Sequence, residues 1–432
     1  MKILLVKPMY PYPFSKGEAT YNRIWPPLCL ANCASLLEKE GHVVKILDCH
    51  AQRIKPDNIT GYIFGYDKIF VTSSALDKWQ CPDINLSPFF AVVNKARTVT
   101  EEIYVMGYHG TVDPGYILSF TKAKAVMRGE PENIIVDICR GKDLSVIDGV
   151  SFISGRDLIS NPEHEPLDLK KLPVPSFHLL DFRRYFYEIL GRRFAIFEIS
   201  RGCSFQCSFC TKVMYKEGVR SKSITQVQEE ISLAVERHKV RTGYFIDLNF
   251  LYNKDIVLQL CDYLVEKKYD FRWSCQARAE FFDLETLRKM KDAGCQIIHI
   301  GIESASNELL IDLNKGVDLG KINEKVSLCK KVGIKVMAFF IVGLPKETEN
   351  DREGSLSLAN KLDVDFAVFN EFIPYGNDMI RRGKPVHNTK IASFIRKALI
   401  KYYLRPDFIL RQDFRLFIYG ARLFLARIKS LA

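Results

Sequence analysis

Hydrophobic residues in the first part of the chain come in short runs that alternate with helical patterns. The runs are rich in Ile and Val, as buried strands are, and fall at residues 2–7, 43–47, 68–72 and 102–106. Between them, apolar residues recur at helical spacing over residues 28–37 and 91–96. Strand–helix–strand alternation predicts a doubly wound, Rossmann-like parallel sheet over residues 1–150, with ligands bound beyond the carboxyl ends of its strands.

Prolines recur in the segment that follows, residues 151–190. Proline disfavours the helical conformation in the residue before it, so this segment is predicted to be a mostly extended connector. Its stiffness would hold two domains in a fixed relative position.

The alternation of strands and helices resumes after residue 190. Six apolar runs predict strands at residues 194–199, 243–248, 271–275, 296–301, 335–342 and 365–369. One helix between them is predicted to begin at Ser223, where Gln226 completes a capping box, and another to begin at Asp283. Six strand–helix units predict a partial (β/α)6 barrel over residues 191–385, with its chemistry at the carboxyl ends of the strands.

The last segment, residues 386–432, is amphipathic, helical in pattern and basic. The favoured interpretation is a helical cap that closes the barrel and exposes a solvated basic face. Weak contact with a membrane surface is the alternative, because basic charge together with Phe and Leu suits anionic lipids. The chain carries a net charge of +11, but no basic–aromatic ladder or zinc-finger spacing accompanies it, so nucleic acid is not favoured as a partner.

Composition is that of a globular protein of two or three domains, with 432 residues, 47% hydrophobic and 26% charged. No apolar run predicts a membrane span, and the start of the chain is predicted to be a strand rather than a signal peptide. Twelve cysteines without paired spacing indicate a reducing compartment, the cytoplasm.

Three cysteines follow the first strand of the predicted barrel. Cys203, Cys207 and Cys210 have the spacing C-x3-C-x2-C on a loop that also contains Gly and Ser. The triad offers three soft thiolates to iron or zinc, and no fourth ligand follows at close spacing. A 4Fe–4S cluster bound by three thiolates keeps one iron open for another ligand. The alternative is that the three cysteines are buried as small hydrophobic residues. Their clustering on a loop disfavours this alternative.

Polar residues follow each of the other five strands. Packing alone does not explain why polar residues recur at every strand end. Carboxylates there can accept hydrogen bonds from an ammonium group or hydroxyls, and Arg278 can pair with a carboxylate in bidentate fashion. The set therefore suits a zwitterionic ligand that carries a ribose. Taken singly, Asp247 and Glu303 are explained equally well as capping or ion-pairing groups.

The triad and two strand-end motifs resemble those of the radical SAM superfamily, in particular its cobalamin-linked members. Phe209 stands beside the last cysteine, and the two motifs are Ile300-Gly-Ile-Glu-Ser304 and Ile341-Val-Gly-Leu-Pro345. The resemblance implies a 4Fe–4S cluster on the three cysteines and S-adenosylmethionine (SAM) as a second cofactor. The residues it places at SAM are Phe209, Asp247, Asn249, Gln276, Arg278, Glu303 and Gly343.

Within that superfamily, several of these positions face a particular part of SAM. Phe209 and the Gly343 loop would flank the adenine. Asp247 would receive the amino group, and Glu303 would lie near the ribose.

The N-terminal region resembles the cobalamin-binding domain that precedes many radical SAM cores. The matching features are Pro26-Pro27-Leu28, the turn at residues 107–111 and Met127-Arg-Gly-Glu-Pro131. The resemblance implies a cobalamin at the carboxyl ends of the strands, with no histidine ligand on cobalt. The residues it places there are Pro8, Ser73, Ser74, Gly107, Tyr108, His109, Gly129 and Glu130.

His50 is the other candidate for a cobalt ligand, because Asp48-Cys-His50 begins like the Asp-x-His-x-x-Gly motif of other cobalamin proteins. Arg53 stands where that motif ends in glycine, and the stretch follows the second strand rather than the first. We therefore reject this role for His50.

The resemblance implies an enzyme that cleaves SAM reductively to a 5′-deoxyadenosyl radical. It further implies cobalamin-dependent methyl transfer to an unactivated carbon or phosphorus of a small-molecule or lipid-linked substrate, with a one-electron reductant such as flavodoxin or ferredoxin as partner. A radical cyclase or oxidative enzyme that uses cobalamin without methyl transfer is one alternative, and a non-catalytic cobalamin or iron–sulfur sensor is another. A methylthiotransferase is disfavoured, because the N-terminal cysteines do not form a second triad. No motif assigns the substrate or a catalytic residue.

Overall fold

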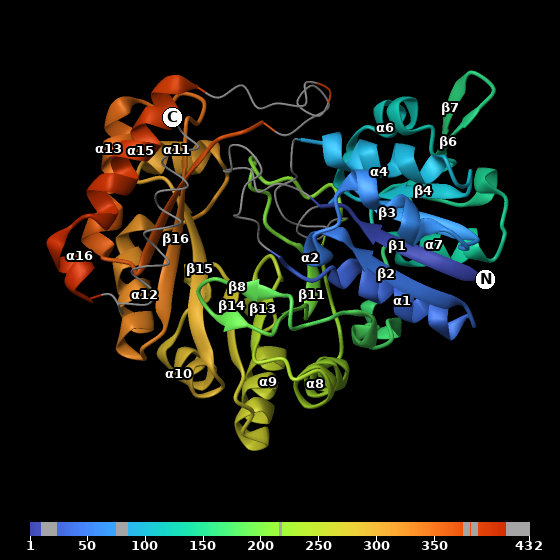
Figure 1. Cartoon of the computed structure of the whole chain (residues 1–432). Helices are drawn as coiled ribbons and strands as arrows, with labels where there is room; N and C mark the ends of the chain where they lie inside the picture. The colour runs from blue at the N-terminus through green and yellow to red at the C-terminus, as the bar shows by residue number, and fades with distance from the viewer. Residues whose placement is uncertain (10–23, 75–84, 216–217, 375–380, 382–387, 412–432) are drawn as a thin grey trace.

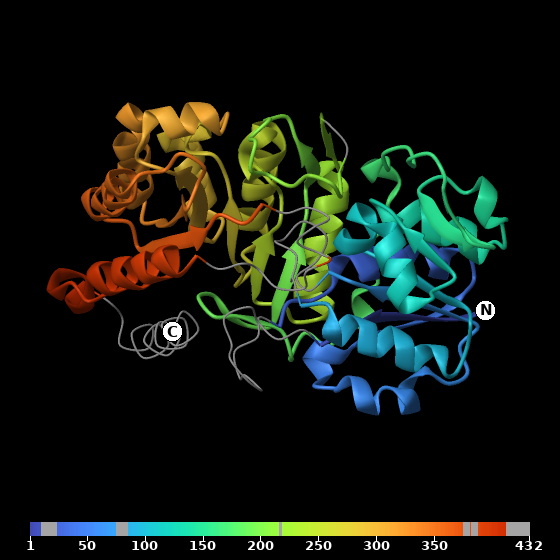
Figure 2. The same cartoon turned by 90° about the horizontal axis from the view of Figure 1, so that it is seen from above.

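The chain forms two α/β domains that lie next to each other in both views (Figures 1 and 2). This computed structural model describes residues 1–9, 24–74, 85–215, 218–374, 381 and 388–411. One domain is built on a seven-stranded sheet and the other on a six-stranded parallel sheet. The predicted fold class is confirmed.

The N-terminal sheet has the strand order β2-β1-β3-β4-β5-β6-β7, and its first five strands run parallel. These strands are β1 (Lys2–Lys7), β2 (Val43–Asp48), β3 (Lys68–Thr72), β4 (Ile103–Met106) and β5 (Ala125–Met127). The helices of the domain are α1 (Leu28–Lys39), α2 (Cys49–Gln52), α3 (Thr60–Ile63), α4 (Ser87–Arg97), α5 (Tyr108–Val112), α6 (Pro114–Thr121) and α7 (Pro131–Cys139). The order reverses at β1 and β3, the kind of switch point where such sheets bind ligands.

The sheet continues beyond residue 150, into the predicted connector. Strands β6 (Val150–Ser154) and β7 (Asp157–Ser160) form an antiparallel hairpin, and β6 pairs with β5. Gly155 makes the tight turn possible with a φ of +62°. The connector is therefore shorter than its prolines predicted, and it ends at the small hairpin of β8 (Phe186–Tyr187) and β9 (Gly191–Arg192).

The second domain is the predicted partial barrel of six parallel strands in sequential order. Its strands are β10 (Phe194–Phe197), β13 (Thr242–Phe245), β14 (Arg272–Gln276), β15 (Cys295–Glu303), β16 (Lys335–Val342) and β17 (Phe366–Glu371). Its helices are α8 (Ile224–Ser232), α9 (Lys254–Lys267), α10 (Leu284–Asp292), α11 (Asn307–Asp312), α12 (Leu319–Lys331) and α13 (Glu349–Leu362). The capping box of Ser223 and Gln226 is present, and Asp283 caps α10 as predicted.

Two C-terminal helices, α15 (Thr389–Tyr403) and α16 (Pro406–Arg411), follow the barrel. Tyr403 fastens α15 to the last strand, because its hydroxyl donates to the Ala367 carbonyl at 2.8 Å and accepts from the Ala367 amide at 3.0 Å. The membrane interpretation rested on the whole basic segment, residues 386–432, of which residues 412–432 lie outside the described residues. No helix in the described parts is long and apolar enough to span a bilayer.

A buried group of charges joins the two domains. Arg201 has no solvent exposure and lies 3.1 Å from Glu130, 2.8 Å from Glu132 and 2.6 Å from Glu198. Glu130 and Glu132 belong to the start of α7 in the N-terminal domain, whereas Arg201 lies on β11 (Ser200–Cys203), which leads into the cysteine loop. We call Arg201 with these three carboxylates the junction cluster. Since a buried arginine needs such partners, the cluster ties the cysteine loop to the N-terminal domain.

His50 lies buried in α2, and the structure predicts that it makes the fold sensitive to acid. Burial, with the charge of Lys7 nearby, lowers the pKa of the ring from 6.5 to about 3. The folded protein thus keeps the ring neutral while the unfolded chain takes up a proton, so stability falls as pH drops below 6.5. The loss between about pH 7 and pH 5 is about 2 kcal/mol.

Replacing this histidine, His50→Leu, is expected to remove that part of the pH dependence. Urea unfolding of wild type and variant at the two pH values measures it. The same loss of stability in both proteins would contradict the assignment.

Candidate active site

Cys203 is the last residue of β11, and Cys207 and Cys210 lie on the irregular loop that leads from it to β12 (Gly218–Ser221). Cys203 and Cys207 are half-buried and Cys210 is exposed, whereas the other cysteines of the described residues are buried. The Cys210 amide donates to the Cys207 carbonyl at 3.1 Å, which keeps these two close in a tight turn. The predicted thiolate triad is therefore accessible on a single loop.

The donor set of this loop fits an iron–sulfur cluster better than a single ion. In the described part of the chain, no three His, Cys, Asp or Glu side chains converge tightly enough to hold one metal ion. A 4Fe–4S cluster needs less convergence, because each thiolate binds a different iron. Positive groups surround the triad: Arg278 Nη1 lies 3.8 Å from Cys207 Sγ, and the Lys212 ammonium donates to the Phe205 carbonyl at 2.6 Å. Burial nevertheless raises the pKa of the Cys210 thiol to about 11.

Asp247, predicted to receive the SAM amino group, is instead turned to the backbone. Its carboxylate accepts from the Ser200 amide at 2.6 Å, from the Ser200 hydroxyl at 2.6 Å and from the Ile199 amide at 3.1 Å. Burial raises the pKa of Asp247 to about 6. The residue holds the turn between β10 and β11, so it positions the cysteine loop, and its predicted contact with SAM stays a prediction.

Arg278 brings the end of β14 against the cysteine loop. Its guanidinium stacks on the ring of Phe205, 3.8 Å from the ring centroid, and pairs with Glu280 at 2.9 Å. Its backbone amide donates to Asn249 Oδ1 at 3.1 Å. The Asn249 Nδ2 group is buried and has no hydrogen-bond partner in the structure. An orphaned donor beside the cluster loop fits a polar ligand there.

Glu303 ends β15 and is paired with a lysine that no sequence pattern singled out. Lys315 Nζ lies 2.8 Å from the Glu303 carboxylate, and both side chains are buried. The same ammonium lies 5.6 Å from the centroid of the Phe209 ring. Glu303 has a φ of +70°, a conformation that is strained for a non-glycine residue and common at functional sites.

Phe209 and the Gly343 loop, the two predicted neighbours of adenine, lie on the same side of the barrel mouth. Phe209 packs with Leu344, which follows Gly343, and with Leu309 and Leu313. The Gly343 amide donates to the Glu347 carboxylate at 2.6 Å, and Gly343 has a φ of +82°. Gln276, the last residue of β14, is half-buried, and its amide group lies 3.4 Å from the Leu248 carbonyl.

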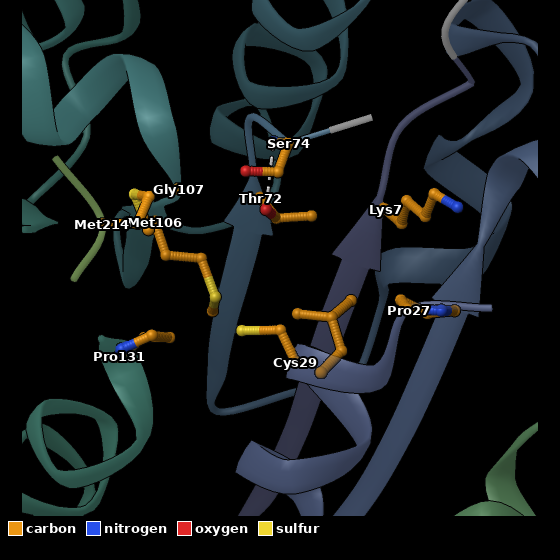
Figure 3. A pocket seen from close by; sticks show the side chains of 10 residues that line it. Lys7, Pro27, Cys29, Thr72, Ser74, Met106, Gly107, Pro131 and Met214 are labelled. Carbon is orange, nitrogen blue, oxygen red and sulfur yellow. Dashed lines mark hydrogen bonds between the residues drawn. The ribbon is translucent and has the colours of Figure 1, made fainter. Parts of the chain in front are cut away.

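A second cleft opens at the carboxyl ends of the N-terminal strands (Figure 3). Two of the predicted cobalamin residues, Ser74 and Gly107, line it. Gly107 has a φ of +105°, and a Cβ there would stand 2.7 Å from Ser74 Oγ and 2.9 Å from Ser73 Oγ, so no other residue fits without rearrangement. The lining residues are Lys7, Pro27, Cys29, Leu30, Thr72, Ser74, Met106, Gly107, Pro131 and Met214.

The cleft is small, about 320 Å³, and its lining combines polar and apolar groups. Hydroxyls from Thr72 and Ser74 stand on one side, and apolar or sulfur-containing side chains make up most of the rest. Gly129 has open space where a Cβ would be, with its amide 2.9 Å from the Thr111 hydroxyl. The predicted residues Pro8, Ser73, Tyr108 and His109 are buried at the same strand ends, and neither they nor Gly129 line the cleft.

Glu130 differs from its prediction. Its carboxylate is paired with Arg201 at 3.1 Å and with Arg220 at 2.9 Å, and it accepts from the Leu167 amide at 3.2 Å. These contacts cross the domain boundary and use both oxygens. Glu130 therefore belongs to the junction cluster rather than to the lining of the cleft, which its neighbour Pro131 provides.

Comparison with known proteins agrees with this arrangement. Residues 197–359 match the model of the radical SAM superfamily. An uncharacterized methyltransferase of Pyrococcus horikoshii is 28% identical over 96% of this chain and 95% of its own length. An anaerobic magnesium-protoporphyrin IX monomethyl ester cyclase of Rubrivivax gelatinosus is 25% identical over 87% of this chain and 68% of its own.

Among solved structures, a radical SAM methyltransferase, TsrM of Kitasatospora setae, has the same fold. Its structure, with cobalamin and a 4Fe–4S cluster bound, superposes with a TM-score of 0.67 at 17% identity and covers 86% of this chain and 72% of that one. At this identity the likeness extends to the fold of both domains and no further.

Proposed function

We propose that this chain, which belongs to the radical SAM superfamily, is a cobalamin-dependent methyltransferase that acts on an unactivated carbon or phosphorus of a small-molecule or lipid-linked substrate. One observation carries the proposal. The cysteine loop at the barrel mouth and the cleft of the N-terminal domain meet directly, since Met214 from the end of that loop lines the cleft. Two cofactor sites in contact suit a reaction in which one cofactor makes a substrate radical and the other delivers a methyl group.

When bound, the 4Fe–4S cluster and SAM supply a 5′-deoxyadenosyl radical, and cobalamin supplies a methyl group to the substrate. Cys203, Cys207 and Cys210 would hold the cluster, and the Arg278 guanidinium lies 3.8 Å from the Cys207 sulfur. Asp247 and the junction cluster orient the loop that carries these cysteines.

The chain's own residues also shape the SAM site. Phe209 and Leu344 present an apolar surface on which adenine can pack, and the buried Lys315–Glu303 pair stands next to it. The unpartnered Asn249 amide can donate to a carboxylate or a ribose hydroxyl. Enclosure of these groups keeps water away from a reactive radical.

A methyl-transfer experiment that needs no knowledge of the substrate tests this function. The protein is reconstituted anaerobically with iron, sulfide and hydroxocobalamin, reduced, and given SAM labelled in its methyl group. Label on the extracted corrinoid, with one S-adenosylhomocysteine for each labelled methyl, is the expected result. Label that stays on SAM, in protein that holds both cofactors, would refute methyl transfer.

A radical cyclase that uses cobalamin without methyl transfer is the second candidate, favoured by the similarity to the Rubrivivax cyclase over most of this chain. The same experiment separates the two, because a cyclase of this kind would release 5′-deoxyadenosine without labelling the corrinoid. Either reaction needs an external electron, for which a flavodoxin or a ferredoxin of the cytoplasm is the proposed donor.

A further inference from the structure

Met214 belongs to the barrel domain by sequence but packs in the N-terminal domain. It follows Cys210 on the cysteine loop, is only 4% exposed, and joins the apolar core that contains residues of β1, β3 and β4. Its neighbour Val213 is 44% exposed. The chain thus directs one side chain of this loop into the other domain, where it forms part of the cleft wall beside Gly107 (Figure 3).

The thioether of Met214 is held there by packing and by a weak hydrogen bond. Its sulfur lies 3.5 Å from the Thr111 hydroxyl, which is also 3.0 Å from the Gly107 carbonyl, and these two acceptors share the one proton of the hydroxyl. The same hydroxyl accepts from the Gly129 amide at 2.9 Å. With so weak a bond at its sulfur, the flexible and polarizable methionine can adapt to a ligand placed against it.

The cysteine loop is therefore fixed to the N-terminal domain on both sides of its cysteines. Arg201 precedes Cys203 and binds the start of α7, from which Pro131 lines the cleft. Met214 follows Cys210 and lines the same cleft from the side of α5. A ligand that fills the cleft therefore contacts the Met214 side chain, and the cysteine loop fixes the position of that side chain.

We propose that Met214 is a cobalamin-contacting residue, through which the barrel domain completes the cofactor cleft of the N-terminal domain. This inference rests on the proposed binding of cobalamin. The cleft wall around Met214 combines apolar and sulfur groups with the hydroxyls of Thr72 and Ser74, which matches the apolar faces and amide-rich edge of a corrin ring. A methionine offers such a ring a broad, adaptable contact.

Methyl-labelled methionine gives a direct test that does not depend on activity. The chain has 8 methionines, of which Met106 and Met214 line the cleft, whereas Met290 and Met337 are buried in the barrel. The protein without its cluster is titrated with cob(II)alamin, whose unpaired electron broadens nearby methyl signals, and hydroxocobalamin serves as the diamagnetic reference. Met214→Leu assigns its signal.

The expected result is broadening of both Met106 and Met214, with Met290 and Met337 unchanged. Broadening of Met106 alone would overturn the role of Met214 and leave cobalamin binding intact. If no methyl signal changes and cobalamin does not bind, the proposed function itself fails in its cobalamin part.

Binding constants give a second, independent measurement. Met214→Leu keeps the apolar volume and is expected to change the dissociation constant of hydroxocobalamin less than about threefold, whereas Met214→Ala should raise it about tenfold. Val213→Ala on the same loop is the matched control and should bind like wild type. Thermal melting without cobalamin shows whether each variant is folded. Equal affinities of folded Met214→Ala and wild type would refute the proposal.

Discussion

Replacing Cys207 with alanine is expected to abolish SAM cleavage, with a loss of at least about a thousandfold. The variant keeps only two thiolates of the triad, and no other cysteine among the described residues lies accessible on this loop to replace the third. The Arg278 guanidinium, which lies 3.8 Å from the Cys207 sulfur in the wild type, would lose this contact. The measurement is iron and sulfide per chain after anaerobic reconstitution, followed by the rate of 5′-deoxyadenosine release.

Cys261→Ala is the matched control for this variant. Cys261 is buried in α9, away from the loop, and the low-dielectric environment raises the pKa of its thiol. This control should retain the cluster and the SAM cleavage of wild type. A Cys207→Ala protein that still holds a full cluster and cleaves SAM at the wild-type rate would contradict the assignment of the ligands.

Replacing Arg201 with methionine is expected to destabilise the protein by about 3–5 kcal/mol, because three carboxylates would lose the cation that compensates them. Glu130, Glu132 and Glu198 all lie within 3.1 Å of the guanidinium, which has no exposure to water. Denaturant unfolding of the cluster-free protein measures the loss without interference from cofactors.

Two further variants show whether the loss comes from buried charge. Arg220→Met breaks a mostly buried pair with Glu130, but Glu130 keeps Arg201 as a cation, so this variant should be destabilised clearly less than Arg201→Met. The double variant Arg201→Met, Glu132→Gln removes a positive and a negative charge together, so it should be less destabilised than the sum of its single variants. Equal effects of Arg201→Met and Arg220→Met would contradict the assignment of the loss to the three carboxylates around Arg201.

The strands and the site loop could be predicted because their signals are local. Buried parallel strands are continuous apolar runs, and the three cysteines lie within one short stretch. The hairpin of β6 and β7 was missed, since prolines nearby outweighed the alternation in residues 150–160. Weak alternation over so few residues is a poorer signal than proline.

Residues that act across the fold could not be found from local pattern. Lys315 lies on no strand end, and its role depends on the distance to Glu303 that the folded chain creates. Glu130 is predicted at cobalamin because it follows β5. In the folded chain its carboxylate forms ion pairs with Arg201 and Arg220 of the other domain. Met214 carries no motif, and only the packing of the two domains shows that it reaches the cleft.

Asp247 shows what strand-end position leaves open. The residue follows the end of β13, and two backbone amides and a hydroxyl donate to its carboxylate, while its predicted contact with SAM stays a prediction. Sequence position predicts which edge of the sheet a side chain occupies. It does not predict whether the side chain faces the ligand or its own backbone.

Formation of 5′-deoxyadenosine by the wild-type chain tests the central claim most directly. The protein is reconstituted anaerobically, its cluster content is checked by iron analysis and spectroscopy, and SAM and a low-potential reductant are added. Release of 5′-deoxyadenosine that depends on both the reductant and the cluster is the expected result. A complete 4Fe–4S cluster that binds SAM but releases no 5′-deoxyadenosine under reduction would contradict it.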